Sequence, residues 1–336
     1  GTNTCSSPSP RPRHHAWARS VRSRTTSAEP VRTVKVSESM PPFYPRTAAL
    51  YLDVTRASPE RAPRSPSLGG VEVLSLAWRT DLALLAQSGS EVEHHPAYVV
   101  VRTPQNPTFR WGNFVLLRRT PLLRDLPGLA ARVEALLPGL GHHAVGIDDP
   151  GAGREDVDRL RRPGWRVAVD TVLTAERVLP PRQLQRSAVV RALSGDRDWS
   201  QKVALDLACA EDAGPDYELF APRRAAAERA AVESRHGAWF GAFDGDRLLA
   251  GLGIFCAGEG LARFQTVQTH PEARRRGLAQ ALLHHAGTHA LGELGARTLV
   301  LVADPDHHAL DLYLGAGFVR TERQVSAECL RTPARP

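Results

Sequence analysis

The sequence predicts an α/β protein in which two domains, each a mixed β-sheet flanked by helices, follow a disordered N-terminal tail. Three observations favour this fold class. Apolar strand-like runs alternate with helical segments from about residue 71, and one strand–turn–helix pattern occurs twice. The length of 336 residues also suits two domains of roughly 150 residues each. We place the tail over 1–68, the first domain over 69–182 and the second over 183–330.

The positive charge of the chain is concentrated in the tail. The formal net charge is +7, and residues 1–65 alone carry 11 Arg and Lys against 4 Asp and Glu. The rest of the chain is therefore neutral, which argues against a dedicated nucleic-acid-binding face. The first 35 residues share their Arg- and Ser-rich composition with organelle transit peptides but lack the apolar segment of a secretory signal. We interpret them as an unstructured extension.

The cysteines indicate a reducing compartment. Cys5, Cys209, Cys256 and Cys329 are scattered, with no CxxC pair and no evident disulfide framework. No apolar run approaches the roughly 18 residues that cross a bilayer. We therefore expect a cytoplasmic protein without a membrane span, as a monomer or a homodimer.

The first domain is predicted to begin with a helix and to alternate strands with helices. The expected helices cover 77–87, 126–137 and 154–160, and the expected strands cover 97–104, 109–117, 143–148 and 164–173.

A Pro-Pro pair at residues 180–181 separates the second domain. Its expected strands cover 187–193, 262–269, 297–303 and 318–326, and its expected helices cover 198–210, 221–237, about 278–294 and 306–317. Asp244-Gly245 lies between two apolar runs, which is a strong signal for a two-residue hairpin.

The two domains resemble each other in sequence. "VGIDDP…RLRRPGW" in the first parallels "VLVADP…LYLGAGF" in the second, each giving a strand, an acidic-Pro turn, a helix and then Gly with an aromatic residue. This correspondence predicts a degenerate internal repeat.

The stretch "HPEARRRGLAQALL" (270–283) is the main candidate for a binding site. Arg274, Gly277 and Ala279 form the pattern Arg-x-x-Gly-x-Ala, which is weak by itself but lies here between a strand and a helix. A helix N-terminus offers unpaired backbone N–H groups and a partial positive charge, and glycine lets a ligand approach the backbone. This corner is therefore suited to a pyrophosphate; a solvated turn is the alternative.

A second candidate is Tyr313, in the short helix "ALDLYLGAGF". A tyrosine in this place serves either as core packing or as a proton donor.

Residues from about 186 to 328 resemble the GNAT superfamily of acyl-CoA-dependent N-acetyltransferases, on "FQTVQTHPEARRRGLAQALL" and "DHHALDLYLGAGF". The resemblance implies that the turn holds the pyrophosphate of acetyl-CoA, the co-substrate, through main-chain N–H groups. It also implies that the preceding strand pairs with the pantetheine arm and that Tyr313 protonates the departing thiolate. The implied cofactor-binding residues are Val267, Gln268, Thr269, Arg274, Arg275, Arg276, Gly277, Leu278 and Ala279.

The resemblance implies direct transfer of an acetyl group to a primary amine in a ternary complex. Such a reaction needs a deprotonated amine, stabilisation of the carbonyl oxygen and a proton for the sulfur. The sequence offers no convincing general base: Gln268 stands where some relatives carry a carboxylate, and Glu259 and Glu218 lack a supporting pattern. A chain of water molecules could serve as the base instead. The alternative function is a non-catalytic regulatory module that binds acyl-CoA. The sequence does not identify the amine acceptor.

The first domain carries a degenerate version of the same strand-to-helix turn. "RDLPGLA" (124–130) has an extra residue, and Pro127 lacks an N–H group that a phosphate would need. We expect this copy to form a wall of the acceptor cleft without binding CoA. Trp111 and Asn113 could face the substrate, although core packing is the simpler role for Trp111.

Several other residues resemble functional groups but have simpler explanations. His285 and His289 are four apart on a predicted helix, but no third ligand accompanies them, so no metal site is predicted. Cys256 fits a buried structural thiol better than a nucleophile. His270 is interpreted as a turn residue, with contact to the ligand as the alternative.

Overall fold

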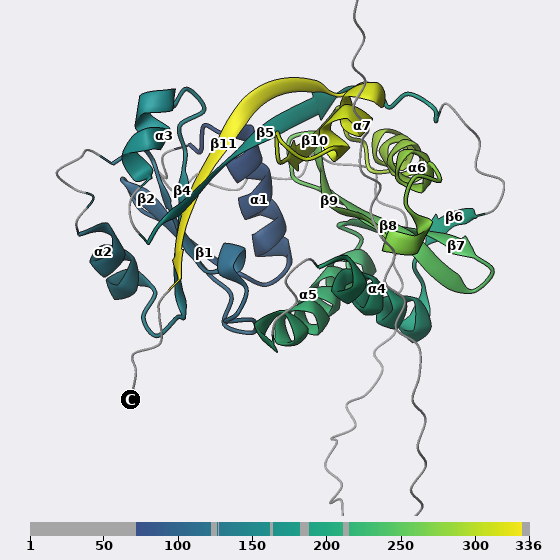
Figure 1. Cartoon of the computed structure of the whole chain (residues 1–336), viewed down its shortest axis with the longest axis horizontal. Coiled ribbons are helices and arrows are strands. Elements are labelled where there is room, and N and C mark those ends of the chain that lie inside the picture. Colours follow the sequence, from purple (N-terminus) through teal and green to yellow (C-terminus); the bar gives the residue numbers. More distant parts are fainter. Residues whose placement is uncertain are drawn as a thin grey trace, which may run out of the picture. The chain divides into compact units, whose positions relative to one another are not determined.

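The computed structural model describes residues 72–121, 126, 128–161, 164–181, 188–210 and 215–330 (Figure 1). All of them belong to one compact unit that spans Ser65–Pro336. The predicted tail over 1–68 lies outside the described residues. The mixed α/β fold with a helix-flanked mixed sheet is confirmed.

The strands form one continuous sheet in the order β1-β2-β3-β4-β11-β5-β10-β9-β8-β7-β6. β3 pairs with β4 and β9 with β10 in parallel, and the other neighbours are antiparallel. The strands are β1 (Glu91–His94), β2 (Tyr98–Arg102), β3 (Phe114–Leu117), β4 (His142–Ile147), β5 (Arg166–Ala175), β6 (Val189–Ala192), β7 (Gly237–Asp244), β8 (Arg247–Cys256), β9 (Leu261–Thr269), β10 (Thr298–Ala303) and β11 (Val319–Leu330).

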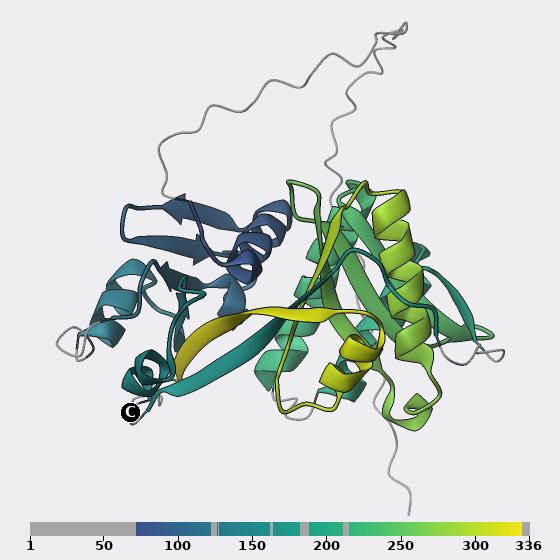
Figure 2. The same cartoon turned by 90° about the horizontal axis from the view of Figure 1, so that it is seen from above.

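Two long strands join the two halves of the sheet, of which the first half contains β1 to β4 and the second half contains β6 to β10. β11, the last strand of the chain, pairs with β4 of the first half, whereas β5 pairs with β10 of the second half. β5 and β11 also pair with each other over most of their length (Figure 2). Outward from this central pair, both sides repeat the same series of antiparallel and parallel neighbours. An internal repeat would give this symmetry; the repeat and the domain boundary near residue 182 remain predictions.

The helices cover both faces of the sheet. They are α1 (Leu76–Gln87), α2 (Leu129–Leu136), α3 (Arg154–Leu160), α4 (Gly195–Cys209), α5 (Pro215–Glu233), α6 (Leu278–Gly292) and α7 (Ala309–Gly315), with 3-10 turns η1 (Arg110–Gly112) and η3 (Pro271–Ala273). α6 and α7 pack on one face of β7 to β10, and α4 and α5 pack on the other (Figure 1).

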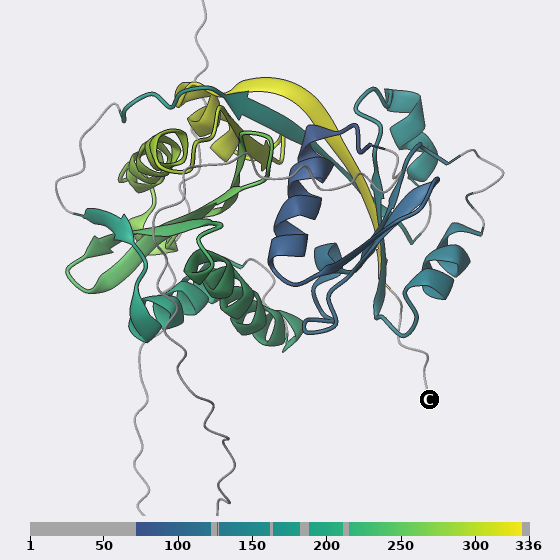
Figure 3. The ribbon, with the colours of Figure 1, turned by 180° about the vertical axis from the view of Figure 1, so that it is seen from behind.

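α1 contacts strands of both halves, β1 and β11 as well as β9 and β10 (Figure 3). Two carboxylates hold its N-terminus, Asp148 directly after β4 and Glu322 within β11. Asp148 accepts hydrogen bonds from the N–H groups of Leu74 and Ser75, at 2.8–3.0 Å, and Glu322 accepts one from Leu76 at 2.9 Å. Negative groups are favourable at the positive end of a helix dipole. These bonds fix α1 as a wall beside the centre of the sheet.

Two predicted elements differ most in extent from the structure. The strand predicted over 109–117 exists only from Phe114, because η1 occupies the preceding residues. The helix predicted from 221 already begins at Pro215 and includes Pro222. Proline disfavours a helix interior but is favourable in the first turn, so a start at 221 is the extent that Pro222 favours. Within the part of the chain described, every helix is too short or too polar to span a bilayer.

Candidate active site

The parallel pair β9 and β10 separates part-way along its length. Pairing joins Leu261–Arg263 to Thr298–Val300, and beyond these residues β9 continues to Thr269 while paired only with β8. Among the described residues no strand pairs with the other edge of β9 from Phe264 onward. The backbone groups of that edge can therefore pair with an extended ligand, as in strand addition.

A β-bulge lies in this open part of β9. Gly251 pairs with Gln268 but Gly253 pairs with Gln265, so two residues of β9 oppose one of β8, and Thr266 has φ of +46°. The bulge directs Gln265 and Thr266 to the same face, where both contact the guanidinium of Arg224, at 3.4 and 2.6 Å. Val267 packs instead against the core cluster that contains α6.

The remaining predicted residues of this strand lie beside the open edge. Gln268 and Thr269 are half-buried, and the side-chain Oε1 of Gln268 is buried without a hydrogen-bond partner in the described part of the chain. The carbonyl of Thr269 accepts from Nε of Arg274 at 3.4 Å. The predicted strand residues and the predicted turn are therefore contiguous in space.

The turn after β9 exposes its backbone. Arg274, Arg275, Arg276 and Gly277 are all exposed, and Gly277 adopts a left-handed conformation with φ of +76° as the N-cap of α6. Within the described residues, no acceptor bonds the backbone N–H groups of residues 275–280. These groups, the dipole of the 15-residue helix α6 and three cationic side chains create a strongly anion-attracting corner.

The equivalent place in the first half has a different backbone. α2 begins at Leu129 after Gly128, whose φ is −91°, so no left-handed residue precedes this helix. Arg124 and Pro127 of the predicted degenerate copy lie outside the described residues. The absence of CoA binding there remains a prediction.

Tyr313 lies on α7, directly after β10, and is buried in the same core cluster as α6. Burial raises the pKa of its phenol to about 12. Among the described residues none forms a hydrogen bond with its hydroxyl. The phenol is therefore protonated at neutral pH and keeps its proton available for a ligand.

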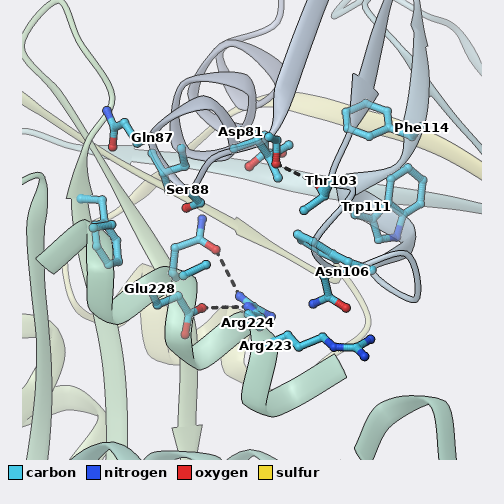
Figure 4. Close-up of a pocket in the computed structure, with 18 of the residues that line it drawn as sticks. Asp81, Gln87, Ser88, Thr103, Asn106, Trp111, Phe114, Arg223, Arg224 and Glu228 are labelled. Atoms are coloured by element: carbon cyan, nitrogen blue, oxygen red, sulfur yellow. Dashed lines mark hydrogen bonds and ion pairs between the residues drawn. The ribbon is translucent and has the colours of Figure 1, made fainter. Parts of the chain in front are cut away.

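A pocket of about 730 Å³ lies on the opposite face of the sheet from α6. α1, α5, β5, β9 and β11 contribute to its walls, together with the segment before β3. Figure 4 shows Arg223, Arg224 and Glu228 on one side and Asn106, Trp111 and Phe114 on the other. This volume is within the range of small-molecule sites.

Aromatic rings form the wall that comes from the first half. Trp78 of α1 lies 6.1 Å from Trp111 and 5.4 Å from Phe114, between ring centroids. Trp78 donates its indole N–H to the carbonyl of Ile147, whereas Trp111 both packs and faces the pocket. Asn113 is buried and bonds the backbone of Thr103 and the loop before β3, which gives it a structural role.

Asp170 of β5 lines this pocket, and sequence reasoning missed it. It lies opposite Gln324 of β11 in the sheet register. Its pKa is raised to about 6, chiefly by burial and also by the nearby charges of Asp304 and Asp81, while Arg263 acts in the opposite direction. No hydrogen bond or ion pair joins its oxygens to a described residue. The available signal was an acidic residue within an otherwise apolar strand, "RVAVDTVL".

The other carboxylates that line the pocket are neutralised by neighbouring side chains. Asp81 contacts Arg263 at 3.0 Å and accepts from Gln324 at 2.7 Å. Glu228 accepts from both Lys202 and Arg224, and Glu328 lies 3.5 Å from Arg110 and 3.4 Å from Arg166. Asp170 therefore differs from them in having no hydrogen-bond or ion-pair partner among the described residues.

The structure places the other candidates away from this pocket. Glu259 and Glu218 are exposed, and Glu259 pairs with Arg79 at 3.4 Å. His285 and His289 pack edge-on against Phe240. No group of three His, Cys, Asp or Glu side chains among the described residues could hold a metal ion.

Cys256 and His270 also have local explanations. Burial raises the pKa of the Cys256 thiol, so it is a poor nucleophile at neutral pH. His270 is the N-cap of η3, where its Nδ1 accepts from the N–H of Glu272 at 3.4 Å.

Comparison with known families identifies the same part of the chain. Residues 204–318 fit the family model described as the acetyltransferase (GNAT) family. The chain carries a GNAT-family acyltransferase domain. This match falls within the resemblance predicted from the sequence, and it includes the open strand, the α6 corner and Tyr313. The first half lies outside the match.

Two solved structures share the fold of the GNAT domain and of much of the remaining chain. A GCN5-related N-acetyltransferase from Kribbella flavida aligns with a TM-score of 0.55 and 14% identity, over 78% of this chain and 97% of that one. A functionally unknown conserved protein from Staphylococcus epidermidis ATCC 12228 aligns with a TM-score of 0.57 and 13% identity, over 73% and 95%. A search of curated proteins found no match.

Proposed function

We propose that this protein is an N-acetyltransferase that moves an acetyl group from acetyl-CoA to a primary amine by direct transfer in a ternary complex. The observation that carries the proposal is the row of backbone N–H groups at residues 275–280, which have no acceptor among the described residues, directly after the open edge of β9. One extended ligand that ends in a diphosphate matches both features.

Three parts of acetyl-CoA, the pyrophosphate, the pantetheine arm and the thioester, would have counterparts in the GNAT domain. The pyrophosphate would accept hydrogen bonds from the turn, with Leu278 and Ala279 in the first turn of α6 and the side chains of Arg274, Arg275 and Arg276 around it. The pantetheine arm would pair with the backbone of Val267, Gln268 and Thr269. The thioester would then lie where β9 and β10 separate, between α7 and the pocket.

The chemistry would use groups on both faces of the sheet. The amine nitrogen attacks the thioester carbonyl, a C–N bond forms, and the C–S bond breaks. Backbone N–H groups near the bulge would stabilise the oxygen as it gains charge. Tyr313 would supply the proton that the departing thiolate takes, and its raised pKa keeps it protonated for this step.

Acetyl-CoA binding tests the proposal. Aspartate at Gly277 adds a negative charge and backbone strain to the corner, so Gly277→Asp should weaken acetyl-CoA binding at least about 100-fold in calorimetric titration. Gly195→Asp is a matched control, because Gly195 also has φ of +68° at the start of a helix, with open space around its Cβ position.

The outcomes separate the enzyme from the alternative. Unchanged binding in Gly277→Asp would overturn the assignment of the corner. Tight binding of acetyl-CoA by the unsubstituted protein, with no CoA release across a broad panel of amines, would favour a regulatory module that binds acyl-CoA without catalysis.

A further inference from the structure

We infer that the acceptor is a small aromatic primary amine without a carboxylate beside its ammonium group, and that Asp170 binds this ammonium group and takes its proton. The inference rests on the proposed function, since it names the acceptor and the general base of the same site. The evidence for it is that the other carboxylates that line the pocket have basic partners, whereas Asp170 has none among the described residues.

Asp170 has the charge pattern of a site for a cation supplied by the ligand. Four carboxylates line the pocket, and three have Arg or Lys partners within 3.5 Å. Asp170 has none among the described residues, although it is half-buried and its charge is poorly solvated. A buried charge is stabilised only by a partner, so a ligand ammonium group would supply what the chain does not.

The sheet places Asp170 next to the expected reaction centre. Its neighbour Thr171 pairs with Ala303 at the end of β10, the strand that flanks the open edge of β9. Asp170 lies on the face that also presents Gln265 to the pocket, opposite the face of α6 and Tyr313. An amine held there would approach the thioester from the side opposite Tyr313.

The far wall of the pocket determines the body of the acceptor. Trp78, Trp111 and Phe114 present an aromatic surface from the first half. Flat apolar groups pack favourably on such a surface. The acceptor would therefore reach from this wall to Asp170, with its polar end in the second half.

The arginines of the pocket do not favour an amino acid. Arg224 already contacts Glu228, Thr266 and Gln265, and Arg166 pairs with Glu328. Arg223 is exposed at the rim. A carboxylate on the carbon that bears the ammonium group would lie close to Asp170, where like charges repel.

The proton balance of the step is complete. One proton of the ammonium group passes to Asp170 and then to solvent, which leaves a neutral amine as the nucleophile. After the C–N bond forms, nitrogen loses a second proton to water as the C–S bond breaks. The sulfur takes a proton from Tyr313. The second proton released by the nitrogen then returns the phenolate of Tyr313 to its protonated form. The products are the amide, CoA with a free thiol, and one proton.

The ionised form of Asp170 is required both to bind and to deprotonate the amine. The charged groups that face it are Asp304 after β10, Asp81 of α1 and Arg263 of β9, and its cross-strand partner Gln324 is uncharged. Activity should therefore fall as the pH drops through about 6, where this carboxylate becomes protonated.

The test measures CoA release from acetyl-CoA with two acceptors of similar size. 2-Phenylethylamine is an ammonium ion at neutral pH, whereas O-benzylhydroxylamine is neutral. Asp170→Asn should lower kcat/KM for 2-phenylethylamine by about 100-fold or more and remove the acidic limb near pH 6, while it changes the rate with O-benzylhydroxylamine by less than about threefold. Asp246→Asn is the matched control, because Asp246 is an exposed residue of the hairpin between β7 and β8.

Each remaining outcome contradicts a different claim. Equal losses with both acceptors would show that Asp170 is structural, and no loss with 2-phenylethylamine would exclude it as the base. Acetylation of phenylalanine or of a short peptide N-terminus, but not of 2-phenylethylamine, would overturn the acceptor class while the acetyltransferase assignment stands. Acetyl-CoA binding without transfer to any of these amines would remove the proposed function itself.

Discussion

Asp81 and Asp170 share a pocket but have opposite electrostatic surroundings. Asp81 has a guanidinium and an amide on its two oxygens, whereas Asp170 has neither. A charge that is partly buried without a partner destabilises the folded state, and such strain is common where a ligand completes the site. The same residue should therefore decide both stability and function.

Replacing Asp170 should stabilise the protein. Because its folded pKa is about 6 and its unfolded value near 3.9, the folded state binds more protons between these values, and its stability falls as pH rises through that window. Asp170→Asn should thus be more stable than the original chain at pH 7.5 by about 1–3 kcal/mol, with a smaller difference at pH 4. Urea unfolding at both pH values measures this; a difference that grows toward low pH would contradict it.

Tyr313 should act on turnover and not on affinity. Tyr313→Phe keeps the buried ring and removes only the hydroxyl, which has no partner among the described residues. We expect kcat to fall by about 100-fold while the Kd for acetyl-CoA stays within about twofold. Rapid-quench turnover and calorimetric titration check the two values. A large loss of affinity with intact turnover would refute the proton-donor role.

Single residues were predicted from sequence with uneven success. The corner of Arg274 to Ala279 could be recognised because its signal is local: a glycine, adjacent arginines and a strand-to-helix change. Asp170 could not, since its role depends on β5 lying beside β10, a pairing between residues about 130 positions apart. Glu259 and Glu218 were considered because sequence alone does not show which carboxylates are already paired or exposed.

At the scale of elements, α4 and α5 are joined by a buried ion network. Lys202 of α4 contacts Asp206 of the same helix and Glu228 of α5, and Glu228 also contacts Arg224, which holds the bulge of β9. Burial raises the pKa of Asp206. The network therefore fixes the position of β9 relative to the pocket wall.

Removing the central cation should be strongly destabilising. Lys202→Met keeps most of the side-chain volume but leaves Asp206 without its partner, at a cost of about 3–5 kcal/mol. Arg197→Met, in the exposed pair with Asp246, is the control and should change stability little. Urea unfolding followed by tryptophan fluorescence measures both; Trp239, whose ring centroid lies 4.6 Å from the ammonium nitrogen of Lys202, is one of the six tryptophans. A loss no larger than that of the control would show that the network carries no stability.

At the scale of the whole described unit, the halves share their central strands. Leu173 belongs by chain position to the predicted first domain but is fully buried in the cluster that contains α6. Sequence patterns gave the strands and the mixed sheet, because apolar alternation is local. They could not show that β5 pairs with β10 of the second half and that β11 pairs with β4 of the first half, because partner choice in a sheet depends on distant residues.

The shared strands predict cooperative unfolding. Residues 72–330 should unfold in one transition, and Leu173→Ala should lower its midpoint as a whole, at a cost of about 2–5 kcal/mol. Calorimetry and urea unfolding with two spectroscopic probes check this. Two unfolding transitions, of which Leu173→Ala shifts the midpoint of only one, would instead show that the halves are energetically independent.

Hydrogen exchange with and without acetyl-CoA reports on the backbone N–H groups that are proposed to bind it. We expect acetyl-CoA to slow exchange both along residues 264–269 of β9 and at residues 275–280 of the turn, with little change at the start of α2. Binding that leaves these amides unprotected, or that protects the α2 region instead, would contradict this expectation.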